Sequence, residues 1–188
     1  MRNKTGLVVV LVGPSGVGKG TVFRRVVDAL DDPFVSVSVT TRPPRQKEQN
    51  GVHYVFVSAE TFDQAAAQGE YLEWATYATY GYATPRKPIE DALQHGQVAL
   101  LEIDVQGALQ VQQAMPDAVT IFLIPPSFAE LERRLRDRGT ETDVQITARL
   151  ARATEELATQ HNFAHVVVND DLDACVAQVL QLINQYDT

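Results

Sequence analysis

The sequence contains very little cysteine and no long hydrophobic segment. Cys175 is the only cysteine among 188 residues, so an internal disulfide is impossible and a reducing compartment is expected. No apolar run approaches the ~18–20 residues needed to cross a bilayer. The first apolar segment starts so near the N-terminus that we expect no signal peptide. These absences predict a cytoplasmic protein with no membrane partner.

An excess of positive charge is also lacking. The chain has 16 Lys and Arg against 24 Asp and Glu, a formal net charge of −8. Such an acidic chain is not expected to bind nucleic acid, which favours a basic surface. The arginines are nevertheless clustered, with Arg42 near Arg45 and four more within 133–138. Because the planar guanidinium suits phosphate oxygens, these clusters predict a pocket for a small polyanion.

Cys175 itself lies beside an apolar stripe in the last predicted helix. No His or Lys adjoins it in sequence to lower the pKa of its thiol. We therefore interpret Cys175 as a small buried apolar residue and not as a nucleophile.

A glycine-rich segment follows the first apolar run. Leu7 to Val12 is typical of a fully buried parallel strand, and a helix is expected from Lys19. The loop N–H groups and the helix N-terminus between them can bind phosphates, so the pattern predicts a P-loop for a nucleoside triphosphate. The residues assigned to ATP here are Gly13, Pro14, Ser15, Gly16, Val17, Gly18, Lys19, Gly20 and Thr21. The alternative is a glycine-rich turn without a ligand.

The P-loop pattern departs from the usual one after its lysine. Gly20 stands where a Ser or Thr hydroxyl usually binds Mg²⁺, and Thr21 comes one residue later. Either Thr21 substitutes for that hydroxyl or water fills the coordination position.

Apolar patterns, capping residues and turn residues predict an alternation of strands and helices. Strands are predicted at 7–12, 34–39, 52–57, 71–77, 98–104, 120–124 and 165–168. Helices are predicted at 19–30, 58–69, 88–95, 127–137, 142–161 and from Leu172 onward. This order predicts an α/β fold of the P-loop NTPase class, with a parallel five-stranded core sheet flanked by helices. Residues 38–87 are expected to form a small mixed insert, and 138–141 a hinge or lid.

Two carboxylates end the strand predicted at 98–104. Glu102 and Asp104 are expected at the same sheet edge as the P-loop, because parallel sheets bind ligands at the carboxyl ends of their strands. The alternative is a structural role in which they cap N–H groups of the following loop.

Several separate blocks together resemble the guanylate kinase family over nearly the whole chain. They lie at 13–19, 36–45, 50–54, 73–75, 101–107, 138–142 and 168–172. The resemblance implies an enzyme of purine metabolism that phosphorylates GMP and dGMP with ATP and Mg²⁺. It further implies a core at 1–37, 88–137 and 150–188, a GMP-binding insert at 38–87 and a lid at 138–149. We expect a monomer or a small homo-oligomer.

The resemblance also assigns roles to individual residues. It assigns the GMP phosphate to Arg42, Arg45, Tyr54 and Tyr82, and the guanine base to Ser38, Glu73 and Thr84. It assigns Mg²⁺, partly through water, to Thr21, Glu102 and Asp104, the last of which is also assigned to GMP. It assigns catalysis to Lys19, Arg42, Arg134, Arg138 and Arg149, and contact with ATP near the adenine to Asn169. For Asn169 a simple turn is the alternative.

Chemistry agrees with these assignments, although each has a plainer alternative. One carboxylate such as Glu73 can accept from both N1–H and the exocyclic amine of guanine, whereas adenine presents a lone pair at N1. The alternative for Glu73 is an exposed strand carboxylate, and the alternative for Arg42 and Arg45 is a solvated basic loop. Ion pairing four residues apart is the plainer account of the 133–138 arginines, and we accept it for Arg133 and Arg136.

Two other functions remain open at this point. A P-loop kinase of another phosphorylated acceptor, such as ribose 1,5-bisphosphate, would not need the pair Ser38 and Glu73. A non-catalytic guanylate-kinase-like interaction module would not need to keep Lys19.

Overall fold

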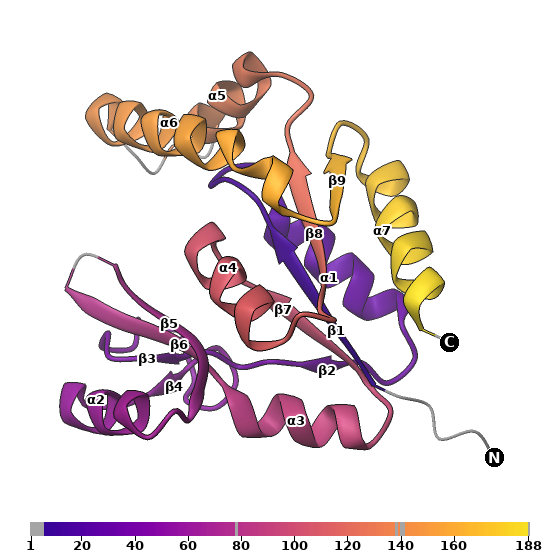
Figure 1. Cartoon of the computed structure of the whole chain (residues 1–188). Helices are drawn as coiled ribbons and strands as arrows, with labels where there is room; N and C mark the ends of the chain where they lie inside the picture. Colours follow the sequence, from indigo (N-terminus) through magenta and orange to yellow (C-terminus); the bar gives the residue numbers. More distant parts are fainter. Residues whose placement is uncertain (1–5, 78, 138, 140–141, 188) are drawn as a thin grey trace. The chain divides into compact units, whose positions relative to one another are not determined.

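The computed structural model describes residues 6–77, 79–137, 139 and 142–187 (Figure 1). The chain forms two compact units. One contains 32–101 and 106–118 together with the start of the chain up to Val8, and the other contains 9–31, 102–105 and 119 onward. Among the described residues, no helix is both long enough and apolar enough to span a membrane.

A five-stranded parallel sheet contains the strand that leads into the P-loop. Its strands are β1 (Leu7–Val12), β2 (Phe34–Val35), β7 (Val98–Glu102), β8 (Val119–Ile124) and β9 (His165–Val168), in the order β2-β7-β1-β8-β9. All six residues of β1 are buried, because the strand has a neighbour on each side. The uninterrupted apolar run that predicted a buried strand is thus explained by its central place.

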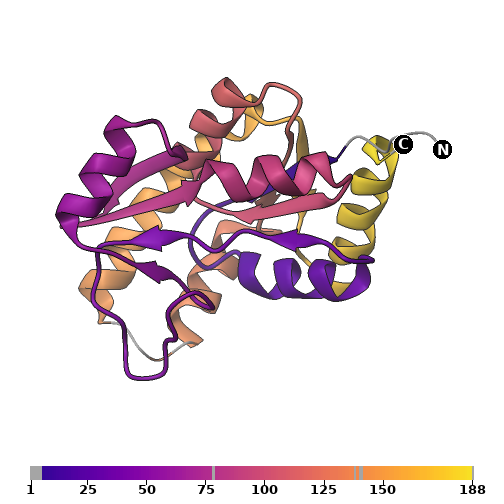
Figure 2. The same ribbon diagram turned by 90° about the horizontal axis from the view of Figure 1, so that it is seen from below.

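Six helices accompany these strands in the chain. They are α1 (Lys19–Ala29), α3 (Arg86–Gln94), α4 (Val105–Ala114), α5 (Phe128–Asp137), α6 (Asp143–Ala158) and α7 (Leu172–Tyr186). Helices α1 and α7 lie side by side in both views (Figures 1 and 2). Thr142 and Gln145 form the predicted reciprocal capping box of α6, which ends before a 3₁₀ turn at Gln160–Asn162.

A separate four-stranded mixed sheet lies within the predicted insert. Its strands are β3 (Val39–Thr40), β4 (Val55–Phe56), β5 (Tyr71–Tyr77) and β6 (Tyr80–Pro85), in the order β4-β3-β6-β5, and α2 (Ala59–Ala67) packs on it. Val39, Phe62, Tyr71 and Ala83 form its core. The methyl group of Ala83 is buried in this core.

Several element boundaries differ from the sequence predictions. The strand predicted at 34–39 is two short strands in different sheets, because the chain leaves β7 after Ser36 and Val39 pairs with Ala83. The strand predicted at 52–57 is only Val55–Phe56, α3 begins two residues earlier than predicted, and β6 and α4 were not predicted at all.

Cys175 is buried on α7, as predicted. Burial raises the pKa of its thiol to about 11, against a smaller opposing effect of Arg134. At neutral pH the side chain is therefore a neutral apolar group.

Candidate functional site

The P-loop connects the carboxyl end of β1 to the N-terminus of α1. Gly13 lies so close to β8 that a Cβ atom there would come within 2.5 Å of the Leu123 carbonyl oxygen. Gly18 caps α1 with a φ of +97°, which favours glycine. The loop therefore needs glycine at both ends, and the N-terminus of the following helix is a favourable place for an anion.

Lys19, the first residue of α1, folds its side chain over this loop. Its Nζ atom donates to the carbonyl oxygen of Gly13 at 2.6 Å and to that of Pro14 at 3.3 Å. The ammonium group thus lies where the loop N–H groups would hold a phosphate, and it can exchange these carbonyl partners for phosphate oxygens.

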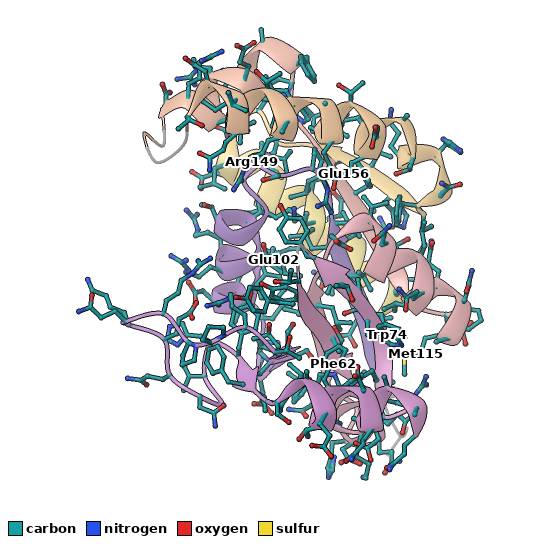
Figure 3. The ribbon with its side chains drawn as sticks, turned by 90° about the vertical axis from the view of Figure 1, so that its left-hand side faces the viewer. Phe62, Trp74, Glu102, Met115, Arg149 and Glu156 are labelled. Carbon is teal, nitrogen blue, oxygen red and sulfur yellow. The ribbon has the colours of Figure 1, made fainter. Side chains whose placement is uncertain are left out.

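Three side chains from distant parts of the sequence hold the P-loop from outside. Asn169, which is buried, donates from Nδ2 to the Val17 carbonyl oxygen at 2.8 Å, and Arg134 Nη1 lies 3.3 Å from the same oxygen. Arg149, which Figure 3 labels on α6, donates to the Ser15 hydroxyl at 2.8 Å. The structure therefore brings Asn169, Arg134 and Arg149 to the predicted loop, whereas Arg138 lies outside the described residues.

An open cavity of about 400 Å³ lies beside these contacts. It is lined by Gly16, Gly18, Thr21, Arg134, Asp137, Asn169, Asp170 and Leu172. The lining thus combines the positively charged Arg134 and two glycines with the carboxylic acids Asp137 and Asp170 and the amide Asn169. Such a lining suits a molecule that carries both an anionic group and hydrogen-bond donors.

Glu102, the last residue of β7, faces the start of α1. A Cβ atom on Gly20 would lie 3.5 and 3.7 Å from the two carboxylate oxygens of Glu102. Desolvation raises the pKa of Glu102, and the charges of Lys19 and Arg24 oppose that shift. The carboxylate therefore lies close to the P-loop lysine, as the position of the strand predicted.

Asp104 has a cationic neighbour that the sequence did not indicate. Arg152 Nη2 lies 3.3 Å from Asp104 Oδ2, and Arg152 Nε donates to Glu156 Oε1 at 2.8 Å. Figure 3 labels Glu156 on the same helix as Arg149. Arg152 thus links the β7–α4 connection to α6 within one unit, which no local pattern could reveal.

The arginines of α5 form the ion pairs that their spacing predicted. Arg134 pairs with Glu130 at 2.8 Å, and Arg136 pairs with Glu132 at 2.8 Å. Arg133 binds Glu130 and Asp137. Hydrogen bonds from Arg133 and Arg134 lower the pKa of Glu130 to about 2. Of these three arginines, only Arg134 also contacts the P-loop.

Arg42 in the other unit is held by a residue that sequence reasoning missed. Its Nη1 and Nη2 atoms donate to the two carboxylate oxygens of Glu48 at 2.9 and 2.8 Å. Its Cζ atom lies 5.4 Å from the ring centre of Tyr54 and 5.8 Å from that of Phe56. Only 10% of the Arg42 side chain is exposed, so the alternative of a solvated loop arginine is wrong.

Glu48 also organises the neighbouring backbone. It accepts from the Arg45 N–H at 2.7 Å, and hydrogen bonds from Arg42 and Arg45 lower its pKa to about 2. The side chain of Arg45 itself is exposed. The rings of Tyr54 and Tyr82 meet edge-on with centroids 6.2 Å apart. The four residues predicted for a substrate phosphate thus belong to one small region of β3, β4, β6 and the loop between β3 and β4.

Glu73 is a buried carboxylate on β5. Only 7% of the residue is exposed, and the alternative of an exposed strand carboxylate is therefore wrong. The Thr84 hydroxyl, opposite Glu73 on β6, donates to its Oε1 atom at 2.5 Å. Half-buried Ser38 accepts through its carbonyl oxygen from the Val55 N–H at 2.9 Å. An acceptor this well fixed suits a ligand with adjacent N–H donors.

Comparison with known proteins gives one consistent result. The family model for guanylate kinase matches residues 5–186. A guanylate kinase from Synechococcus sp. (strain CC9902) is 53% identical over 174 residues, covering 93% of each chain. One from Thermus thermophilus is 48% identical over 183 residues, covering 97% of this chain and 82% of the relative. A crystal structure of guanylate kinase from Anaplasma phagocytophilum superposes with a TM-score of 0.80 at 32% identity, covering 100% of this chain and 89% of that one.

Proposed function

The chain belongs to the guanylate kinase family, and from this premise we propose that it transfers the γ-phosphoryl group of ATP to GMP or dGMP. The products are ADP and GDP or dGDP, so we assign the reaction to purine nucleotide metabolism, and we propose that the enzyme is cytoplasmic. The observation that carries the proposal is the buried Glu73 carboxylate, fixed by Thr84, in a unit that also holds Arg42 in an ion pair with Glu48.

The P-loop is the proposed site for ATP. Its N–H groups and Lys19 bind the phosphates, while the cavity lined by Thr21, Asn169 and Asp170 accepts the nucleoside part. Arg134 and Arg149 already touch the loop, so they can neutralise charge on the transferring group. The attacking GMP oxygen is already anionic, and catalysis therefore consists of positioning and charge stabilisation without a general base.

The insert is the proposed site for GMP. Arg42, Arg45, Tyr54 and Tyr82 bind the GMP phosphate, and Arg42 does so with a side chain that Glu48 has already oriented. Glu73 accepts from guanine N1–H and the exocyclic amine, with Ser38 and Thr84 beside it. Adenine would leave that carboxylate facing a lone pair, and burial makes such a mismatch costly.

Mg²⁺ is the proposed cofactor. The Glu102 carboxylate lies next to Gly20, at the start of α1, where an added Cβ atom would be in ordinary van der Waals contact with it. Mg²⁺ prefers oxygen ligands, so Glu102, Asp104 and Thr21 are of the residue types that fit this ion. We propose that Glu102 and Asp104 hold it through water, with Thr21 as the nearest hydroxyl along α1. Bound Mg²⁺ would supply positive charge to the nucleotide phosphates. The assignments of 38–87 as the GMP-binding insert and 138–149 as the lid remain predictions.

A panel of acceptors tests the proposed function. ADP formation from ATP and Mg²⁺ is measured with GMP, dGMP, AMP, UMP, dTMP and ribose 1,5-bisphosphate. We expect turnover with GMP and dGMP only, with at least about 10³-fold preference over AMP, because a hydrogen-bonding site rejects a base that leaves its groups unpaired. Turnover of the sugar phosphate alone would support phosphoryl transfer at the P-loop but contradict the assignment of a guanine-binding site. A folded protein that turned over none of them would be an interaction module.

Asn169 offers a separate test of the ATP site. Asn169→Ala removes the donor to the Val17 carbonyl and frees the space next to Gly18, so the P-loop loses one of its restraints. We expect the KM for ATP to rise about tenfold while the KM for GMP changes less than twofold, since loss of one buried hydrogen bond is worth about 1–2 kcal/mol. Asn184→Ala on the exposed face of α7 is the control. An unchanged KM for ATP would contradict a role of Asn169 in ATP binding and favour the alternative that it only forms a turn.

A further inference from the structure

Helix α4 is hydrogen-bonded to β5, the strand that carries Glu73. The side chain of Gln110 makes two hydrogen bonds to the main chain of Trp74: its Oε1 accepts from the Trp74 N–H at 3.2 Å, and its Nε2 donates to the Trp74 carbonyl oxygen at 2.9 Å. The amide therefore takes the place of a neighbouring strand at this point of β5. The position of the main chain immediately after Glu73 is thereby fixed to the helix.

The same helix meets the carboxylate itself at Gly107. A Cβ atom on Gly107 would lie 2.6 Å from Glu73 Oε2 and 2.9 Å from Glu73 Cδ, so the Glu73 carboxylate would have to move to make room for it. Gly107 is buried within α4, where glycine is disfavoured relative to alanine unless space demands it. Gly107 and Gln110 are three residues apart, so both lie on the same face of the helix.

We propose that Gly107 and Gln110 are the positioning residues of Glu73, and through it the determinants of guanine selectivity. The inference rests on the proposed function, since it concerns the base that Glu73 reads. Thr84 holds Oε1 of the carboxylate, the surface of α4 at Gly107 confines Oε2, and Gln110 fixes the strand beside them. The Glu73 carboxylate is thus oriented before guanine binds. Binding of the base therefore does not have to offset the conformational entropy lost in ordering this side chain.

Trp74 itself does not supply this rigidity. The residue is 47% exposed, and its ring meets that of Phe62 edge-on, with ring centroids 6.3 Å apart. Phe62 is the buried anchor of α2 on the insert sheet. The strand therefore has a helix bound to its main chain through Gln110 and a second helix packed against the side chain of Trp74.

The first test is Gly107→Ala. The clashing atoms belong to the flexible end of the Glu73 side chain, so we expect the carboxylate to move and the fold to persist. Alanine is also the better helix former, so the thermal midpoint should not fall. We expect the KM for GMP to rise at least about tenfold, with the KM for ATP within twofold of the wild type. The kcat/KM ratio of GMP to IMP, which lacks the exocyclic amine, should fall toward one.

Gln110→Ala is the second variant, and Gln113→Ala on the exposed part of the same helix is its matched control. Gln110→Ala should raise the KM for GMP and lower the GMP to IMP ratio, whereas Gln113→Ala should alter neither. A merely structural role would instead lower the thermal midpoint and change the KM values for both substrates together.

A double-variant cycle completes the design. In a Glu73→Ala background, Gly107→Ala should have no further effect on the KM for GMP, because no carboxylate remains to be displaced. Additive effects, or a Gly107→Ala enzyme with wild-type GMP to IMP selectivity, would overturn the inference. The wild-type rate with GMP, measured alongside, tests the proposed function independently of these comparisons.

Discussion

Lys19→Met is expected to abolish phosphoryl transfer and leave the fold intact. The ammonium group is held over the P-loop because it donates to the loop carbonyls of Gly13 and Pro14. Methionine has a similar length but no charge, so the negative charge that develops on the transferring group loses its fixed counter-charge. We expect kcat to fall at least about 10³-fold, the scale of removing one such electrostatic group.

The measurement is the steady-state rate of ADP formation with saturating ATP, Mg²⁺ and GMP, together with a circular dichroism melt. Lys87→Met is the control, since Lys87 is an exposed residue of α3 that forms only an ion pair with Asp91 on the same helix. If Lys19→Met kept more than about a tenth of the wild-type rate, the P-loop would not be the site of phosphoryl transfer.

Glu73→Gln is expected to cost the enzyme most of its selectivity for guanine. The substitution preserves size, but it replaces one acceptor oxygen with an NH₂ group in a site that is only 7% exposed. Turned toward the base, that NH₂ group faces an N–H donor of guanine; turned toward Thr84, whose hydroxyl can accept from it, it takes the place of an acceptor and leaves one guanine N–H without a partner. A buried donor without an acceptor costs about 1–3 kcal/mol. We expect kcat/KM for GMP to fall about 10²–10⁴-fold, mostly through KM.

The comparison needs GMP, IMP and ATP kinetics on the same preparation. Glu70→Gln, at an exposed position just before β5, is the control and should behave as the wild type. An enzyme with Glu73→Gln that still preferred GMP as strongly as before would show that the base is read elsewhere. The KM for ATP should remain unchanged in both variants, because Glu73 and the P-loop belong to different units.

The sequence predicted best those features that are encoded locally. The apolar run of β1 and the capping box of α6 are each contained in a few adjacent residues, and both were confirmed. Strand β6 was missed because its sequence contains Gly81 and Pro85, which are unusual in strands, although it forms a hairpin with β5 in which Tyr77 pairs with Tyr80. Helix α4 was missed because it follows β7 almost without a turn.

In the candidate site too, the residues predicted from the sequence are those with a local signal, and the residues missed are those placed by tertiary packing. Residue types predicted Lys19 and Arg42, but Glu48 was not predicted, because its contact with Arg42 depends on how the loop between them folds. The burial of Glu73 and the space it takes from Gly107 follow from packing between α4 and the insert sheet. Such contacts are tertiary, and no pattern of neighbouring residues contains them.

Cys175 has a practical consequence for measuring these variants. A thiol reagent reacts with the thiolate, and with a pKa of about 11 only about one thiol in a thousand is ionised at pH 8. The sulfur is also covered in the folded chain, so modification requires α7 to open. The rate of labelling therefore reports the population of opened molecules. The protein thus carries its own probe of conformational stability, which can be read at ambient temperature without denaturant.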